Sequence, residues 1–221
     1  RVYATKEEAF EVFCRLSSGF VENITFESDA ELHRISRLLL KKPHLAEMLK
    51  SGSHAAFEQA LGADPEGREI AERFEWFIER FGNKLVHQEF HERQWCDDPK
   101  LVWRHIAASM DGDNEDPKER ALKKAEEREQ AYADTRRRFK GPLGWVLRPA
   151  FSFAYRRMCD YIPARENDQF HFGKLVRAMR GTLLHMGRRL VEAGVIAHED
   201  DIYFLELQKI PLSTQGASDM K

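Results

Sequence analysis

The chain has 221 residues, of which 42 % are hydrophobic and 33 % charged, with a formal net charge of −2. This length allows one domain or two small lobes around a buried core. A charge near zero provides no whole-molecule field that would attract nucleic acid or anionic lipid, so nucleic acid is not an expected partner.

No apolar run approaches the about 20 residues that a membrane-spanning helix needs, so no membrane partner is expected either. The three cysteines are scattered and show no CxxC spacing. Such a set is typical of reduced thiols and favours a cytoplasmic protein.

Helical periodicity dominates the first half of the chain, and the alternation typical of strands is nearly absent. Thr5 and Glu8 form a capping-box pair before a first helix. A second helix over 29–40 is predicted to end before Pro43, because proline cannot continue a helix. Short helical segments are expected at 43–49 and 53–61.

The clearest pattern in this half predicts a helix over 68–81. Ile70, Phe74, Phe77 and Phe81 follow one another at steps of four, three and four residues, which places them on one helix face. Pro99 opens another helix that runs through 106. The run 111–117 is rich in Asp, Gly and Asn and is predicted to be a hinge.

In the second half, a charged helix is expected from Pro117 to Lys140, followed by an aromatic-rich helix over 143–161. Pro163 is expected to start the longest helix, which ends at Gly194. The prediction is therefore an all-α fold, a multi-helix bundle with at most one short strand, near 201–207. Its lobes are 1–110 and 118–212, joined by the 111–117 hinge and followed by a disordered tail at 213–221.

The last long helix carries the candidate binding site. Two apolar series with seven-residue spacing mark its buried stripe, Phe172–Met179–Met186 and Val176–Leu183–Leu190. Extended back by one step, they reach Arg165 and Gln169, which are therefore expected to face inward at the start of the helix. An unpaired buried guanidinium is costly, and a helix N-terminus disfavours a bare cation.

Three interpretations of Arg165 remain open. It binds an anionic ligand, it is neutralised by a carboxylate such as Glu166, or it points into solvent at the helix end. The first interpretation makes Arg165, Gln169, Glu166 and Phe172 substrate-binding residues, with the guanidinium gripping a phosphate or carboxylate at two points.

Other polar groups give weaker patterns. His87, His91 and Cys96 are metal-ligand types, but no further ligand falls in register, so no metal site is predicted. His87 with Glu89 is a weak catalytic candidate for acid–base chemistry, with a polar loop as the alternative. The basic residues between 136 and 157 indicate a solvated helix face rather than a nucleic-acid surface, because upstream glutamates balance them.

Two stretches of the sequence carry a family resemblance. One comprises Ile-Pro-Ala-Arg-Glu-Asn at 162–167 with the segments 187–196 and 199–205. The other comprises Phe-Gly at 81–82 and Trp-Cys-Asp-Asp-Pro at 95–99. Together they resemble the central helical region of the phosphoenolpyruvate synthase-like phosphotransferases, the family of the rifampicin phosphotransferases. The resemblance covers roughly 74–207 and is weak before that.

In that family an ATP-grasp domain binds the nucleotide, a swivelling domain carries a phosphorylated histidine, and the helical region holds the phosphate acceptor. The resemblance implies a small-molecule acceptor for this chain, with Arg165 near it. It also implies ATP and Mg²⁺ for the complete enzyme, no cofactor bound by this segment, and ATP-grasp and swivel-histidine domains as partners in cis or in trans. The sequence has no glycine-rich nucleotide loop, so the segment is not expected to be catalytically complete alone.

The chain also departs from the family pattern. Gln169 stands where the family tends to have lysine, and Gly82-Asn83-Lys84 stands where it often has Gly-His-Arg. Of the acidic pair before the tryptophan, only Glu89 remains. These changes keep an alternative open, a non-catalytic helical interaction or scaffold module.

Overall fold

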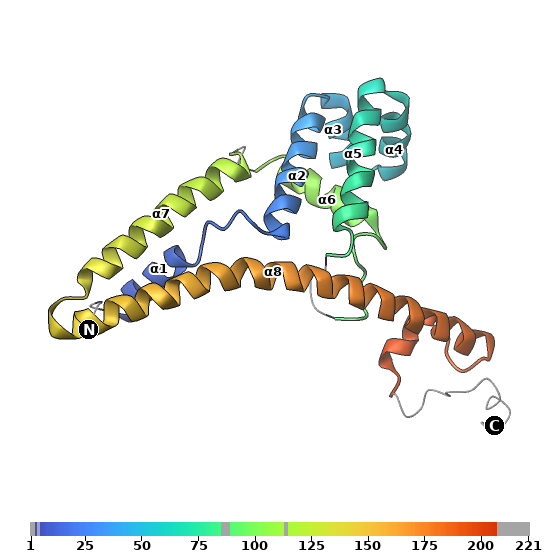
Figure 1. The fold of residues 1–221 in the computed structure, drawn as a ribbon. Helices are drawn as coiled ribbons and strands as arrows, with labels where there is room; N and C mark the ends of the chain where they lie inside the picture. The colour runs from blue at the N-terminus through green and yellow to red at the C-terminus, as the bar shows by residue number, and fades with distance from the viewer. Residues whose placement is uncertain (1–2, 4, 85–88, 113–114, 207–221) are drawn as a thin grey trace.

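The computed structural model describes residues 3, 5–84, 89–112 and 115–206, and every regular element within them is helical (Figure 1). The all-α fold class is thereby confirmed. Among these helices, none has both the length and the apolar character needed to cross a lipid bilayer. The elements are α1 (Lys6–Leu16), α2 (Ile24–Leu40), α3 (Pro43–Lys50), α4 (His54–Ala63), α5 (Pro65–Phe81), α6 (Pro99–Ser109), α7 (Pro117–Arg138), α8 (Gly141–Glu192) and the 3₁₀-helix η1 (Glu199–Phe204).

Side-chain caps fix the beginning of the first two helices. Thr5 Oγ1 accepts a hydrogen bond from the backbone N–H of Glu8 at 3.1 Å, as predicted. Asn23 Oδ1 accepts from the N–H of Phe26 at 2.8 Å. Because this cap satisfies a first-turn donor, α2 begins at Ile24 rather than at the predicted residue 29.

The main hydrophobic core lies between α2, α3, α4, α5 and α6. Phe74 of α5 stacks on Trp103 of α6 with 3.8 Å between ring centroids. Phe170 of α8 also belongs to this core, with its ring centroid 6.5 Å from that of Phe81. All four residues predicted to share one face of the 68–81 helix are buried here, namely Ile70, Phe74, Phe77 and Phe81.

A second, smaller cluster joins α1, α7 and the first half of α8. Tyr132 of α7 stacks on Tyr155 of α8 at 4.2 Å between centroids, and Leu16 of α1 is buried beside them. In this cluster α1, which precedes the predicted hinge at 111–117, packs with helices that follow it. In the main core the reverse holds, since Phe170 follows that segment and packs with helices that precede it. The division into two lobes stays a prediction, and the tail at 213–221 lies outside the described residues.

The prediction that Pro163 starts a new helix is wrong. One helix of 52 residues, α8, runs through both Pro149 and Pro163 (Figure 1). An interior proline removes one backbone hydrogen bond and crowds the preceding turn, which costs about 3 kcal/mol. Packing on α7 before Pro163 and on α2 after it holds the helix straight enough to continue.

The apolar run at 201–207 does not form a strand where it is described. It belongs to η1, which folds back along the end of α8 after a turn at Gly194, where φ is +70°. Ile202 packs on Leu190 in a third small cluster. A Cβ atom added to Gly187 would lie 2.3 Å from the carbonyl oxygen of Glu199, so glycine permits this close approach.

Candidate functional site

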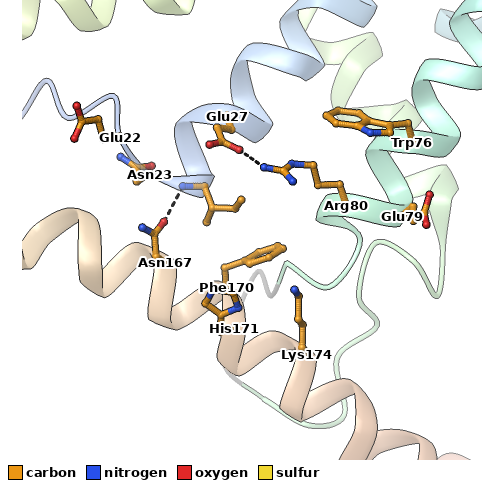
Figure 2. A pocket seen from close by; sticks show the side chains of 11 residues that line it. Glu22, Asn23, Glu27, Trp76, Glu79, Arg80, Asn167, Phe170, His171 and Lys174 are labelled. Atoms are coloured by element: carbon orange, nitrogen blue, oxygen red, sulfur yellow. Dashed lines mark hydrogen bonds and ion pairs between the residues drawn. The ribbon is translucent and has the colours of Figure 1, made fainter.

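A hollow of about 670 Å³ opens between the start of α2, the end of α5 and the middle of α8 (Figure 2). We call it the α2–α5–α8 hollow. Phe170, which is 8 % exposed, lines it from α8, and Trp76 lines it from α5. The hollow therefore has aromatic walls and polar edges.

Two hydrogen bonds hold the beginning of α2 against α8. Asn167 Oδ1 accepts from the backbone N–H of Ile24 at 3.0 Å, and Thr25 Oγ1 donates to Glu166 Oε2 at 3.2 Å. The Ile24 N–H is one of the helix-terminal donors that has no partner inside its own helix. The two α8 side chains thus set the distance between two walls of the hollow.

An ion pair closes one side of the hollow. Arg80 of α5 reaches across to Glu27 of α2, with 2.7 Å between Nη2 and Oε2. Its guanidinium carbon also lies 5.8 Å from the ring centroid of Trp76. Figure 2 shows this pair spanning the space on the side away from α8.

Lys174 supplies a second cation from α8. Its Nζ lies 5.2 Å from the Phe170 ring centroid, and no described carboxylate lies within ion-pair distance of it. His171 stands beside it, and Glu22 and Glu79 complete the charged edge. The lining therefore mixes both signs of charge rather than forming an anion trap.

A smaller cavity of about 130 Å³ lies on the other side of Phe170. Gln169 and Glu166 line it, as does Lys84, whose Nζ donates to Ser28 Oγ at 3.0 Å. Two of the sequence-predicted site residues, Gln169 and Glu166, thus lie in a concave polar environment.

The inward placement predicted for Arg165 is wrong. Because α8 is continuous, Arg165 lies in a helix interior and not at an N-terminus, and its side chain is 59 % exposed. Its Nη2 pairs with Glu166 Oε1 at 2.5 Å, which raises the pKa of the guanidinium above its ordinary value. Arg165 lines neither the hollow nor the small cavity. The structure therefore agrees with two of the three interpretations, pairing with Glu166 and exposure to solvent.

The buried stripe of α8 is also offset from the predicted one. Phe172 is 41 % exposed, whereas Phe170 is buried. The buried positions include Gly173, Gly187 and Arg180, which a search for apolar residues passes over. Val176 and Leu190 were correctly predicted to be buried. Phe172 and Met179 of the other predicted series are instead 41 % and 44 % exposed.

Of the weak catalytic pair, Glu89 is an exposed residue whose carboxylate lies 3.2 Å from Nδ1 of His91. His87 lies outside the described residues. The described residues do not bring together three His, Cys, Asp or Glu side chains that could hold a metal ion.

The family-like Trp-Cys-Asp-Asp-Pro stretch has a structural role. Trp95 is buried against Phe77, and the Cys96 N–H donates to the Gly82 carbonyl at 3.0 Å. Burial is the main cause that raises the pKa of the Cys96 thiol, which favours its neutral form. The segment packs the loop onto the core and does not present a nucleophile.

Arg180 ties this loop to α8 and η1. Its buried Nη1 donates to the carbonyls of Phe90 and Glu92 at 3.0 and 3.1 Å. Its Nε lies 3.4 Å from Asp97 Oδ2, and its guanidinium carbon lies 5.3 Å from the Tyr203 ring centroid. Sequence reasoning missed this residue because a charged side chain was not expected in a buried stripe.

Sequence reasoning also missed the residues that line the hollow, above all Trp76, Arg80 and Lys174. The signal for Lys174 was available, since it follows Phe170 by four residues and therefore shares its helix face. The contributions of Trp76 and Arg80 depend on how α5 approaches α8, which no local pattern records.

Comparison with known proteins assigns the chain to a family. A sequence profile described as the rifampicin phosphotransferase fourth domain matches residues 1–166, including the part before residue 74 where the resemblance is weak. The chain is also 23 % identical over 189 residues to an uncharacterized phosphotransferase, YvkC, of Bacillus subtilis (strain 168). That match covers 83 % of this chain but only 22 % of the relative, so the chain spans about a fifth of its length. The chain belongs to the family of the rifampicin phosphotransferase fourth domain, a domain of a multi-domain phosphotransferase.

Proposed function

We propose that this chain is the acceptor-binding segment of an ATP-dependent phosphotransferase, and that the acceptor binds in the α2–α5–α8 hollow. The observation that carries this proposal is the hollow itself, about 670 Å³ in volume with two aromatic walls. Pockets for drug-sized ligands usually have about 300–1,000 Å³, apolar walls and a few convergent polar groups.

The charges around the hollow favour a hydroxylated acceptor over a polyanion. Glu22, Glu27 and Glu79 offset the positive charges of Arg80 and Lys174. Carboxylates accept hydrogen bonds from hydroxyl groups, while an anionic ligand would be repelled by them. A ring system of the acceptor would lie against Trp76 and Phe170.

Lys174 is the residue best suited to assist transfer. In this proposal Lys174 takes the role of the lysine that the family tends to have where this chain has Gln169. A flexible ammonium without a carboxylate partner can approach a phosphoryl group as charge develops on it. Its role in this proposal is to stabilise that charge and not to act as a nucleophile.

The rest of the reaction needs parts beyond this segment. The proposal assigns ATP and Mg²⁺ to an ATP-grasp domain and the relay to a swivelling histidine domain, in cis or in trans. The segment would then be catalytically incomplete by itself. Its three free cysteines support an assignment to the cytoplasm.

The proposal can be tested by thermal unfolding of the chain with rifampicin as the hydroxylated probe. A ligand at about 100 times its Kd stabilises the folded state by about 2.7 kcal/mol. For a chain of this size that raises the Tm by roughly 5–11 °C. ATP and phosphoenolpyruvate serve as comparison ligands and should produce no comparable shift.

Two substitutions locate the binding site. Trp76→Ala and Lys174→Gln should each weaken binding at least about tenfold, because each removes a contact worth roughly 1.4 kcal/mol or more. Lys100→Gln on α6 is the matched control, since Lys100 is exposed and lies outside the hollow. A probe shift that is the same in all three variants would remove the hollow as the acceptor site.

A non-catalytic interaction module is the second candidate function. The observation that favours it is the number of large apolar side chains that α8 exposes, including Leu143, Phe153 and Tyr161. Exposed apolar patches of this extent often mark protein interfaces. This function predicts that none of the probes shifts the Tm.

A further inference from the structure

The outer face of α8 carries a long apolar stripe that is separate from the hollow. Its seven large members are 41–69 % exposed and occur at steps that fit one helix face over 143–179. They are Leu143, Val146, Phe153, Tyr161, Phe172, Leu175 and Met179. Over 36 residues this stripe is about 54 Å long.

No described element covers this stripe. The buried positions of α8, among them Tyr155, Gly173 and Arg180, lie on the opposite face, where α7, α2 and the 89–97 loop pack. The stripe stops after Met179, where η1 begins to cover α8 through Leu183 and Met186. It is therefore an unpartnered face of the helix that organises the fold.

The order of residues along the stripe is self-complementary. Consider a two-fold axis that passes between Ile162 and Pro163. It would place each residue opposite the partner residue for which the two residue numbers add up to 325. It places Phe153 opposite the partner's Phe172, and Val146 opposite the partner's Met179. Ala150 then faces the partner's Leu175, Tyr161 faces the partner's Ala164, and every stripe member from Val146 to Met179 meets an apolar residue.

The charges follow the same symmetry. In this register Arg157 faces the partner's Asp168, and Asp160 faces the partner's Arg165. Within one chain, Arg157 holds an exposed ion pair with Asp160, whereas Arg165 pairs with the less exposed Glu166. Because an exposed ion pair contributes little to stability, exchanging the Arg157–Asp160 pair for one across an interface costs little.

We infer that α8 is a homodimer interface, in which two copies of this chain pair antiparallel through the stripe about an axis at residues 162–163. An interface of this kind is isologous, so a single surface must complement itself, as this one does. A stable dimer buries about 800 Å² per partner. Three aromatic and four aliphatic side chains, each 41–69 % exposed in the single chain, provide much of that area.

A hollow of about 620 Å³ lies at the centre of this surface. It is lined by Arg157, Met158, Asp160, Tyr161 and Ala164, which surround the proposed axis. The partner's Tyr161 would enter it from across the axis. Because the α2–α5–α8 hollow opens on a different face of α8, this inference is independent of the proposed function.

Sedimentation equilibrium of the full chain between about 1 and 100 µM tests the inference. The wild-type chain should dimerise reversibly, and Phe153→Glu should weaken the dimer at least about tenfold by removing a central apolar contact. Trp145→Glu is the matched control. Trp145 is 87 % exposed but lies about 130° around the helix from the stripe, so this change should leave the dimer intact.

Charge reversal tests the register. Arg157→Asp and Asp168→Arg should each weaken dimerisation, because each places like charges opposite one another. The double variant should recover most of the loss. A wild-type chain that stays monomeric at 100 µM overturns the inference. So does equal weakening by Phe153→Glu and Trp145→Glu, or a double variant no better than either single one.

Discussion

Replacing Arg180 with methionine should destabilise the protein far more than any exposed arginine on the same helix. Methionine keeps the aliphatic volume but removes the guanidinium, whose side chain is only 6 % exposed. The substitution leaves Asp97 without its cation and leaves the carbonyls of Phe90 and Glu92 without a donor.

The magnitude follows from these lost partners. Breaking a buried ion pair by removing one partner costs about 3–5 kcal/mol. Asp97 is partly exposed, so the lower end applies, and we expect a loss of about 3 kcal/mol in the free energy of unfolding. For a chain of this length the Tm should fall by roughly 6–12 °C.

Arg188→Met is the matched control. Arg188 also lies on α8 and also pairs with the C-terminal segment, through Glu199 at 3.1 Å, but both side chains are exposed. Its loss should cost at most about 1 kcal/mol. Urea unfolding gives both values, and hydrogen exchange should show lost protection in residues 89–97 for Arg180→Met alone. Equal losses in the two variants would refute the view that Arg180 holds the loop.

Three further outcomes are expected. Gly187→Ala should lower stability by about 1–3 kcal/mol, because the new Cβ atom meets the Glu199 carbonyl. Gly181→Ala, where a Cβ atom would meet open space, should instead raise stability by roughly 0.5–1 kcal/mol. Thermal unfolding compares the two variants. Asn23→Ala should cost about 1 kcal/mol in urea unfolding through loss of the α2 cap, and an unchanged midpoint would contradict it. Burial, with the hydrogen bond to Glu129, raises the pKa of Tyr155. The stability that the neutral Tyr155 hydroxyl contributes to the folded protein is therefore complete below about pH 10 and is lost as the pH rises further. Tyr155→Phe should flatten the decline in the free energy of unfolding measured between about pH 9 and 11.

Local patterns predicted the helices well where burial and periodicity agree. The Ile70, Phe74, Phe77 and Phe81 face of α5 is buried as expected, since a helix with one apolar face has one way to pack it. Thr5 caps α1 because the capping interaction spans only three residues. Such features depend on neighbours in sequence.

The continuation of α8 through Pro163 could not be predicted from neighbouring residues alone. The helix-breaking tendency of Pro163 is overridden by contacts that α8 makes with α7 and α2, which are distant in sequence. A helix that began at Pro163 would have placed Arg165 at its N-terminus, and the predicted inward orientation of Arg165 depended on that start. The true neighbour of Arg165 is Glu166, and the hollow forms around Phe170 instead.

The candidate site could be predicted only in part. Gln169 and Glu166 line a small cavity, while Arg165 and Phe172 are exposed, and the binding role of all four stays a prediction. The hollow itself joins Ile24 and Asn167, 143 residues apart. No spacing rule relates side chains across such a separation.

The continuity of α8 has a mechanical consequence. The helix is about 78 Å long, and the Asn167–Ile24 hydrogen bond holds it near the hollow. Leu143 lies about 36 Å from that point in one direction and Lys174 about 10 Å in the other. A tilt of about 5° around this fulcrum would move Leu143 by about 3 Å and the Lys174 backbone by about 1 Å. A force applied to α8 near Leu143 would thus move the Lys174 ammonium group, which lies over the Phe170 ring, by only about a third of the displacement at Leu143.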